Sequence, residues 1–471
     1  MGRSGLAVAS IVSVLAFVPA AYADAPGDVP PAARTVRQEA LRAPRGDPEG
    51  RPLPLLAHWH RMTTPPAWQV EMIRRGHPFL PWVAYSREMA PERIEQQDGE
   101  AIGVLRKWNL PVVLLTGGQW EADFYSRDEY KNAPADQTGV TVGPNGEKLN
   151  SVSPFSPVEP WRKLGVKWTD NPACRKLQEL YPDPPLVFFL TNNEAHDLRW
   201  SDAERDKRYL EKYGAGRSDE FKRKVVGDGW IERYRALIDG MRSGLASETW
   251  RANCRVMAYN GFGPDHLGRS PGWAQWSLAT ADRVSISWHM WQGAVPEAYD
   301  NAWEGEKMAF HVYSSQVEMM NLVFMKDLAW ETDAGFWLEV IFWDGDAAKA
   351  AQYEEAGIAY TPELYGGWVQ YVLWTLTPRV AREWRGSSYR RDAGWWPYFA
   401  AIIRAVDLVH ADEVLKRFWR KGELVPNRSA PHPFSHDVPE RYAAADRWFH
   451  LPTDCDPPRP WTLTTRIPVF T

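Results

Sequence analysis

The sequence predicts an α/β protein built as a (β/α)8 TIM barrel, with long loops after its strands and an irregular C-terminal extension. Several short runs are apolar throughout, which is typical of strands buried on both faces of a parallel sheet. These runs alternate with helix-like stretches eight times within residues 51–425. Barrels of this class occupy roughly 200 to over 400 residues, so the segment is long enough to form one.

Eight candidate strands support the barrel, and the fourth is the most apolar. The first and the eighth are short and flanked by proline. An open doubly wound sheet is the rival architecture, but it usually carries a glycine-rich turn after its first strand, and no such turn follows Leu55–His58. In chain order, the predicted strands are Leu55–His58, Phe79–Tyr85, Val112–Thr116, Leu186–Thr191, Arg255–Tyr259, Arg283–Trp288, Gly335–Val340 and Arg379–Trp384.

Helix-like segments separate these strands. The clearest one follows the eighth strand and places apolar residues at helical spacing between Trp395 and Arg420. The others include Pro91–Trp108, Ser218–Ala246, Tyr313–Leu328 and Ala347–Ala356. Strand and helix alternation of this kind predicts a parallel sheet.

The two ends of the chain are expected to lie outside the barrel. Residues 1–23 resemble a cleavable signal peptide, because an apolar run follows Arg3 and ends in the small-x-small pattern before Asp24. This predicts a secreted or periplasmic protein without membrane insertion after cleavage; an uncleaved N-terminal anchor is the alternative. Residues 24–50 predict a flexible leader, residues 51–425 the barrel, and the proline-rich residues 426–471 a tail packed on it.

The composition narrows the class of ligand. A net charge of -5, a pI near 6.2 and the lack of a basic run argue against nucleic acid as a partner. Tryptophan is unusually frequent, with 26 residues against 17 Phe and 18 Tyr, and its flat ring suits the C–H faces of sugars as well as protein cores. The oligomeric state is not readable from the sequence.

The sequence predicts no metal and no organic cofactor. Cys174, Cys254 and Cys455 have no metal-ligand spacing; one disulfide with one thiol left over fits the count, but the sequence does not choose the pair. The metalloprotease H-E-x-x-H and P-loop patterns are absent.

Two glutamates are candidates for chemistry. Glu194, preceded by Asn193, directly follows the fourth predicted strand, and strand carboxyl ends form the active-site face of a barrel. A solvated loop glutamate is the alternative. Glu339 lies among the apolar and glycine residues of 335–343, where an unpaired charge would cost several kcal/mol. It needs either a chemical task or a structural partner such as Arg382.

This pattern resembles the retaining clan A glycoside hydrolases. The resemblance rests on Asn193-Glu194 after strand four, Glu339 in strand seven, His289 within Trp288-His289-Met290-Trp291, and Trp384 at the end of strand eight. It is similar in strand order and spacing to the clan as a whole, and no single family is matched.

The resemblance implies a role for each matching residue. Glu194 would be the general acid/base and Glu339 the nucleophile, while Asn193 would bind the sugar 2-hydroxyl and Trp384 would floor the cleavage subsite. Retaining hydrolysis needs its two carboxyl groups about 5–5.5 Å apart, which strands four and seven can provide by facing each other across the mouth.

The strand-seven carboxylate has an alternative. The apolar run continues beyond Glu339 through Trp343, so the position of the strand end decides which carboxylate reaches the mouth. If the strand ends near Val340, Glu339 qualifies; if it runs through Trp343, Asp344 qualifies. We expect Glu339, because an enclosed carboxylate requires a reason, whereas Asp344 beside Gly345 is already explained as a turn residue.

Further candidate sugar contacts follow other predicted strands, although each could instead pair within the protein. Those we single out are His58, Trp120, Asn260, His289, Trp291 and Arg382. The Arg and His residues among the predicted rim side chains suggest an acidic or sulfated glycan. The alternatives to a retaining hydrolase are a non-catalytic carbohydrate-binding barrel and an inverting hydrolase that pairs Glu194 with Asp344 or Glu383 at about 6.5–9.5 Å.

Overall fold

The computed structural model describes most of the residues assigned to the barrel. The predicted signal peptide, residues 1–23, and most of the tail lie outside the described residues. The residues that the structure describes are 29–43, 46–59, 66–116, 120–191, 198–259, 291–298, 335–343, 354, 357, 359–384, 396–422, 448–450 and 462–464.

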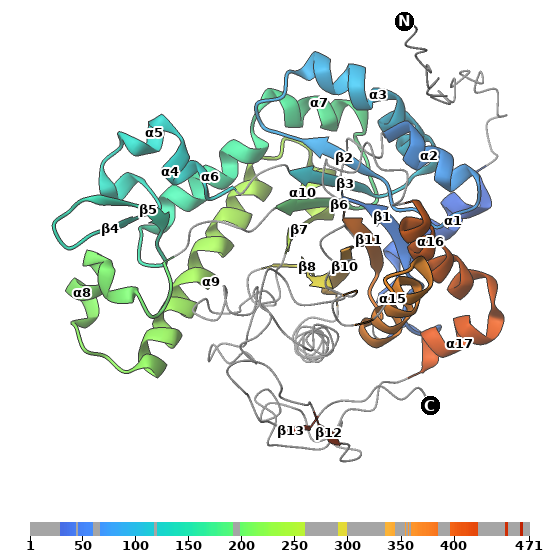
Figure 1. Cartoon of the computed structure of the whole chain (residues 1–471). Helices are drawn as coiled ribbons and strands as arrows, with labels where there is room; N and C mark the ends of the chain where they lie inside the picture. The colour runs from blue at the N-terminus through green and yellow to red at the C-terminus, as the bar shows by residue number, and fades with distance from the viewer. Residues whose placement is uncertain are drawn as a thin grey trace, which may run out of the picture.

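Eight parallel strands form a nearly closed barrel at the centre of the molecule (Figure 1). They are joined in the order β1-β11-β10-β8-β7-β6-β3-β2. Leu56 of β1 almost closes the ring, because its N–H donates to Pro78 (2.7 Å) and its carbonyl accepts from Leu80 (2.6 Å), just before β2. The predicted (β/α)8 fold is confirmed. The strands are β1 (Leu55–His58), β2 (Trp82–Tyr85), β3 (Val112–Thr116), β6 (Val187–Thr191), β7 (Cys254–Tyr259), β8 (Gly293–Val295), β10 (Trp337–Trp343) and β11 (Val380–Trp384).

Among the described residues, helices follow β1, β2, β3, β6, β10 and β11 and cover the outside of the barrel. The helix after β2, α3 (Pro91–Trp108), starts with proline and ends at Asn109 in the left-handed region (φ 52°), so its span matches the prediction. The remaining outer helices are α2 (Pro66–Arg74), α7 (Pro172–Leu180), α9 (Asp219–Gly244), α10 (Glu248–Asn253), α15 (Pro362–Leu376), α16 (Trp396–Ala411) and α17 (Glu413–Lys421).

Alternation along the strands separates an inner face from an outer one. The rings of Phe188 on β6 and Trp337 on β10 meet inside the barrel, with centroids 4.4 Å apart, although β7 and β8 separate their strands in the ring. On the outer face, His58 of β1 contacts Phe399 of α16 at 5.6 Å between ring centroids. Successive residues of one strand therefore enter different environments.

The sixth strand differs from the prediction. Its place in the ring is taken by β8, which pairs with β7 on one side and β10 on the other. A short continuation, β9 (Glu297–Ala298), also pairs with β10 after a break at Pro296. The predicted strand Arg283–Trp288 lies outside the described residues and is not the strand between β7 and β10, so that assignment was wrong.

A lobe projects from one side of the barrel, at the left in Figure 1. Its helix α6 (Val158–Thr169) packs along α9 with the two backbones in contact, because a Cβ on Gly165 would collide with the carbonyl oxygen of Leu237, and one on Gly240 with that of Arg162. The lobe contains α4 (Asp123–Ser126), α5 (Asp128–Lys131), β4 (Val140–Val142), β5 (Lys148–Val152), α6 (Val158–Thr169) and α8 (Lys207–Tyr213).

The expected flexible leader contains a packed helix instead, α1 (Pro31–Leu41). Its buried face includes Ala33, Val36 and Ala40, and these small residues gave little apolar contrast in the sequence. Proline occupies its first turn, where the missing N–H costs nothing.

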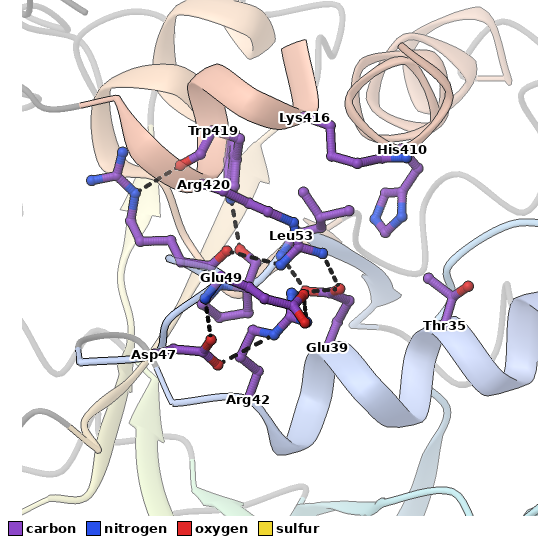
Figure 2. Close-up of polar contacts among 12 residues, drawn as sticks. Thr35, Glu39, Arg42, Asp47, Glu49, Leu53, His410, Lys416, Trp419 and Arg420 are labelled. Carbon is purple, nitrogen blue, oxygen red and sulfur yellow. Dashed lines mark hydrogen bonds and ion pairs between the residues drawn. The ribbon is translucent and has the colours of Figure 1, made fainter. Parts of the chain in front are cut away.

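Buried Glu39 of α1 joins the N-terminal helix to the end of the barrel segment, as Figure 2 shows. It accepts from Arg420 of α17 (2.7 Å), from Arg42 (3.3 Å) and from the backbone N–H of Leu53. Burial raises the pKa of this carboxyl above its usual value, although Leu53 and Arg42 act in the opposite direction. We call Glu39, Arg42, Leu53 and Arg420 the Glu39 cluster.

Two short strands are described in the predicted tail. They are β12 (Trp448–His450) and β13 (Thr462–Thr464), and they pair antiparallel. Across the described parts of the chain, no helix is long and apolar enough to span a membrane.

Candidate active site

The fourth strand ends where the prediction placed its end. β6 runs to Thr191, so Asn193 and Glu194 follow it by two and three residues. Both predicted residues lie outside the described residues. The end of β6 is tied to its neighbour, because the Thr116 hydroxyl at the end of β3 donates to the carbonyl of Leu190 (2.7 Å). In the sequence, Glu194 is the third residue after this buried strand.

Glu339 is enclosed in the barrel interior and paired with Arg382. The side chains of both residues are fully buried. Glu339 Oε2 accepts from Arg382 Nε (2.7 Å) and lies 2.5 Å from Nη2, while Oε1 accepts from the indole N–H of Trp337 (2.9 Å). Both guanidinium nitrogens thus approach the same carboxylate oxygen, and the Nε contact is a charge-assisted hydrogen bond. This is the structural partner considered as the alternative to a catalytic task.

The seventh strand is longer than predicted. β10 continues to Trp343, which pairs in register with Trp384, the last residue of β11. Glu339 pairs in register with Val380, the first residue of β11, so it lies well before the strand end. The expected end near Val340 was wrong. Asp344 is the first residue after the strand and lies outside the described residues.

His58 and Glu383 form a second buried pair on the outer face. His58 Nε2 lies 2.5 Å from Glu383 Oε2, and both side chains are fully buried. The contact of His58 with Phe399 places this pair between the barrel and α16. His58 was predicted as a sugar contact at the mouth and Glu383 as an alternative base, but this location is behind the barrel wall, away from its interior.

Arg382 makes contacts besides the ion pair. Its Nη1 donates to the carbonyl of His58 (2.9 Å), and its guanidinium carbon lies 6.0 Å from the ring centre of Trp59. Trp59 was not singled out in the sequence. The signal was present in the alternation: Ala57 pairs in register with Arg382, and Trp59 lies on the same side of the chain two residues later.

Trp120 and Trp291 lie in an aromatic cluster rather than on an exposed rim. Both are buried, and their ring centroids are 6.1 Å apart. Trp120 also contacts Trp168 of α6, and Trp291 contacts Tyr234 of α9 at 4.9 Å. In this arrangement their rings pack the lobe against the barrel.

Of the remaining predicted sugar contacts, the structure describes only the backbone of Trp384. Asn260 and His289 lie outside the described residues. His289 was expected after the sixth strand, yet β8 begins at Gly293, so His289 precedes the strand that holds the sixth place. For Trp384 the backbone is described as the last residue of β11, which agrees with the predicted strand end.

A charged cavity of about 510 Å³ lies where the lobe meets the barrel. Its cations are already compensated: Arg87 pairs with Asp123 (2.8 Å), Lys167 with Glu129 (2.9 Å) and Arg127 with Glu88 (2.5 Å). The cavity is lined by Arg87, Glu88, Arg127, Asp128, Glu129, Lys167, Asp170 and Asn171, none of which was a predicted site residue.

Two of the cysteines are buried free thiols. Burial raises the pKa of both Cys174 and Cys254 to about 12, which keeps them protonated and poorly nucleophilic near neutrality. Cys455 lies outside the described residues. Within the part of the chain that the structure describes, no group of three or more His, Cys, Asp or Glu side chains is arranged to hold a metal ion.

Comparisons with known proteins add little to this picture. No family model matches the chain, and no curated protein matches it. The X-ray structure of β-mannanase from the blue mussel Mytilus edulis aligns with 76% of this chain and 92% of that chain at 12% identity, with a TM-score of 0.24. At this TM-score the likeness identifies neither family nor activity, and the barrel assignment rests on the strand topology of the chain itself.

Proposed function

We propose that this protein is a glycoside hydrolase that acts with retention, using Glu194 as general acid/base and, as nucleophile, a carboxylate in the seventh strand or directly after it. One observation carries the proposal: Glu194 follows the carboxyl end of β6 by three residues, in a barrel whose fourth and seventh strands face each other through Phe188 and Trp337. Carboxyl ends of barrel strands supply the catalytic residues of such enzymes.

The geometry of β10 favours Asp344 over Glu339 as the nucleophile. The contact between Phe188 and Trp337 marks a common height on the two strands. Glu194 follows this contact by six residues and Asp344 by seven, whereas Glu339 follows it by two. At about 3.3 Å per residue, Glu339 lies roughly 13 Å below the strand end. Two carboxylates that share one sugar need comparable heights.

The contacts of Glu339 support the same choice. A nucleophile needs an oxygen that can approach the anomeric carbon, but the side chains of Arg382 and Trp337 engage both oxygens of Glu339 in a buried site. Glu339 then has a structural task, which is to balance the charge of Arg382 inside the barrel.

The proposed reaction needs no group beyond the two carboxyls. The nucleophile attacks the anomeric carbon, while protonated Glu194 donates its proton to the departing glycosidic oxygen. Water then attacks the glycosyl-enzyme ester, and Glu194 accepts a proton from that water. A negative nucleophile nearby favours the protonated form of the acid in the first step.

Leaving-group dependence tests the role of Glu194. We expect Glu194→Gln to abolish cleavage of natural glycosides while sparing the first step on activated aryl glycosides, which leave without protonation. Single-turnover rates on both substrate types measure this difference. Equal, severe losses on both would remove Glu194 from the acid/base role.

Trapping identifies the second carboxylate. A fluorinated mechanism-based sugar should label Asp344, with fragmentation used to separate Asp344 from Glu339 on the same peptide. An adduct on Glu339 would restore the first choice. NMR of the first product reports its anomeric configuration. An inverted configuration would replace the retaining mechanism with single displacement.

Substrate and location are also proposals. We propose a poly- or oligosaccharide substrate and export through the predicted signal peptide. The Arg and His residues predicted at the rim suggested an acidic glycan. Arg382 and His58 are instead buried and paired within the protein, so the first substrate screen should include neutral glycans. Binding without release of reducing sugar from any substrate would instead indicate a non-catalytic carbohydrate-binding barrel.

A further inference from the structure

Aromatic side chains gather at the start of helices that follow three neighbouring strands. Tyr360 precedes α15, Trp396 and Tyr398 lie in the first turn of α16, and Trp68 lies in the first turn of α2. The strands before these helices, β10, β11 and β1, are consecutive in the ring. In a (β/α)8 barrel the helices start on the side where the strands end, which is the side of the mouth.

A contact with the barrel fixes the height of this aromatic group. Phe399, in the first turn of α16, packs against His58, the last residue of β1, at 5.6 Å between ring centroids. The start of α16 is therefore level with the carboxyl end of β1. Trp396 precedes Phe399 by three residues, and their ring centroids are 6.1 Å apart.

The rings pack against one another, and one of them is largely exposed. Trp68 lies against Trp396 with centroids 5.9 Å apart, and Tyr360 stacks on Tyr398 at 5.4 Å with planes 14° apart. Trp68, Tyr360 and Tyr398 are half-buried, whereas Trp396 is 46% exposed. An exposed indole held by a second ring has a fixed orientation at low entropic cost.

Exposure alone does not assign a role, because isolated exposed apolar residues are common. Leu408, at the other end of α16, is 47% exposed and needs no explanation. Trp396 differs in its chemistry and its position: its ring is flat, has a polar edge and lies on the mouth side of the barrel. Such rings stack on the C–H faces of pyranoses.

We propose that Trp396, supported by Trp68, is a sugar-stacking subsite on the outer rim of the mouth, separate from the cleavage position. The inference rests on the proposed carbohydrate function and extends it. The ligand is one pyranose unit of a polysaccharide chain that runs from the cleavage position over α16. A long chain binds both positions, while a short glycoside reaches only the first.

Affinity electrophoresis of the full-length protein tests this subsite. Native gels containing galactomannan, xylan, carboxymethyl cellulose or carrageenan measure binding without requiring hydrolysis. We expect wild-type protein to be retarded in at least one gel and Trp396→Ala to weaken the apparent affinity about tenfold. Leu408→Ala is the matched control on the same helix and should bind like the wild type. Trp396→Tyr retains a flat ring and should keep most of the affinity.

Kinetics and stability complete the design. Trp396→Ala should raise KM for the polymer while leaving turnover of an aryl monoglycoside and the melting temperature unchanged. Unchanged polymer binding in Trp396→Ala, or failure of every gel to retard the wild type, overturns the subsite. An equal loss of affinity in the Tyr variant also overturns stacking, and this outcome applies even if the Ala variant fails to fold.

The two proposals fail in different ways. Hydrolysis by the wild type with unaltered binding in Trp396→Ala removes the subsite and leaves the hydrolase. Polymer binding that depends on Trp396, in a protein that releases no reducing sugar, retains the subsite and removes the hydrolase.

Discussion

Two consecutive residues of β11 each belong to a buried pair, and the two pairs differ in the basic side chain that contacts the carboxylate. Arg382 points into the barrel and pairs with Glu339, whereas Glu383 points outward and pairs with His58. Arginine cannot shed its proton in a protein, but histidine titrates near neutrality. Loss of the carboxylate partner therefore leaves a buried charge in the arginine pair, whereas an imidazole can stay buried as a neutral hydrogen-bonding group.

Breaking the inner pair should have the largest effect. We expect Glu339→Gln to lower the free energy of unfolding by about 3 to 5 kcal/mol, because the guanidinium of Arg382 is left buried without its counter-charge. Urea denaturation measures the loss. Glu413→Gln, on the exposed surface of α17, is the control and should change little.

A double replacement sharpens this comparison. Glu339→Leu with Arg382→Met removes both charges and should recover most of the stability that the single variant loses. If Glu339→Gln instead keeps full stability and loses all activity, Glu339 has a catalytic rather than a structural task.

The outer pair should tolerate change better. We expect Glu383→Gln to cost about 1 to 3 kcal/mol, since the amide oxygen can still accept a hydrogen bond from the buried imidazole of His58. The same denaturation experiment at pH 8 provides the measurement. A cost equal to that of Glu339→Gln would show that the identity of the cation does not govern the two pairs.

The Glu39 cluster should show the smallest effect, about 1 kcal/mol for Glu39→Gln, because the amide can still accept from Leu53. Its pH dependence carries more information. Burial raises the folded-state pKa of Glu39 above its ordinary 4.5, so folding takes up a proton. The stability of the wild type relative to the variant should fall as the pH rises from 4.5 through the raised pKa, then become constant. A rise over that interval would mean that the arginines outweigh burial.

The fold was largely predictable because parallel barrel strands carry a continuous apolar signal. Leu186–Thr191 was predicted and β6 spans Val187–Thr191. The sixth strand was missed because Gly293–Val295 is short, begins with glycine and is followed by Pro296, all of which weaken a strand pattern. Arg283–Trp288 alternates better and attracted the assignment.

The site was less predictable because it depends on register and on where strands end. The pairing of Glu339 with Arg382 was foreseen as an alternative, since an enclosed carboxylate needs a partner. The outer pair was not foreseen, because only the register of His58 with Glu383 brings these residues together. The extension of β10 to Trp343 could not be separated from a loop by its apolar residues alone, and the proposed choice between Glu339 and Asp344 depends on this extension.

The backbone contact between α6 and α9 restricts how this chain can diverge. Gly165 and Gly240 each face the carbonyl of the opposite helix, and Gly244 faces Thr169 in the same seam. Larger side chains at these positions would force the helices apart and shift the lobe. Gly240 and Gly244, four residues apart on α9, together with Gly165 on α6, therefore form a sequence pattern by which distant relatives with the same lobe could be found.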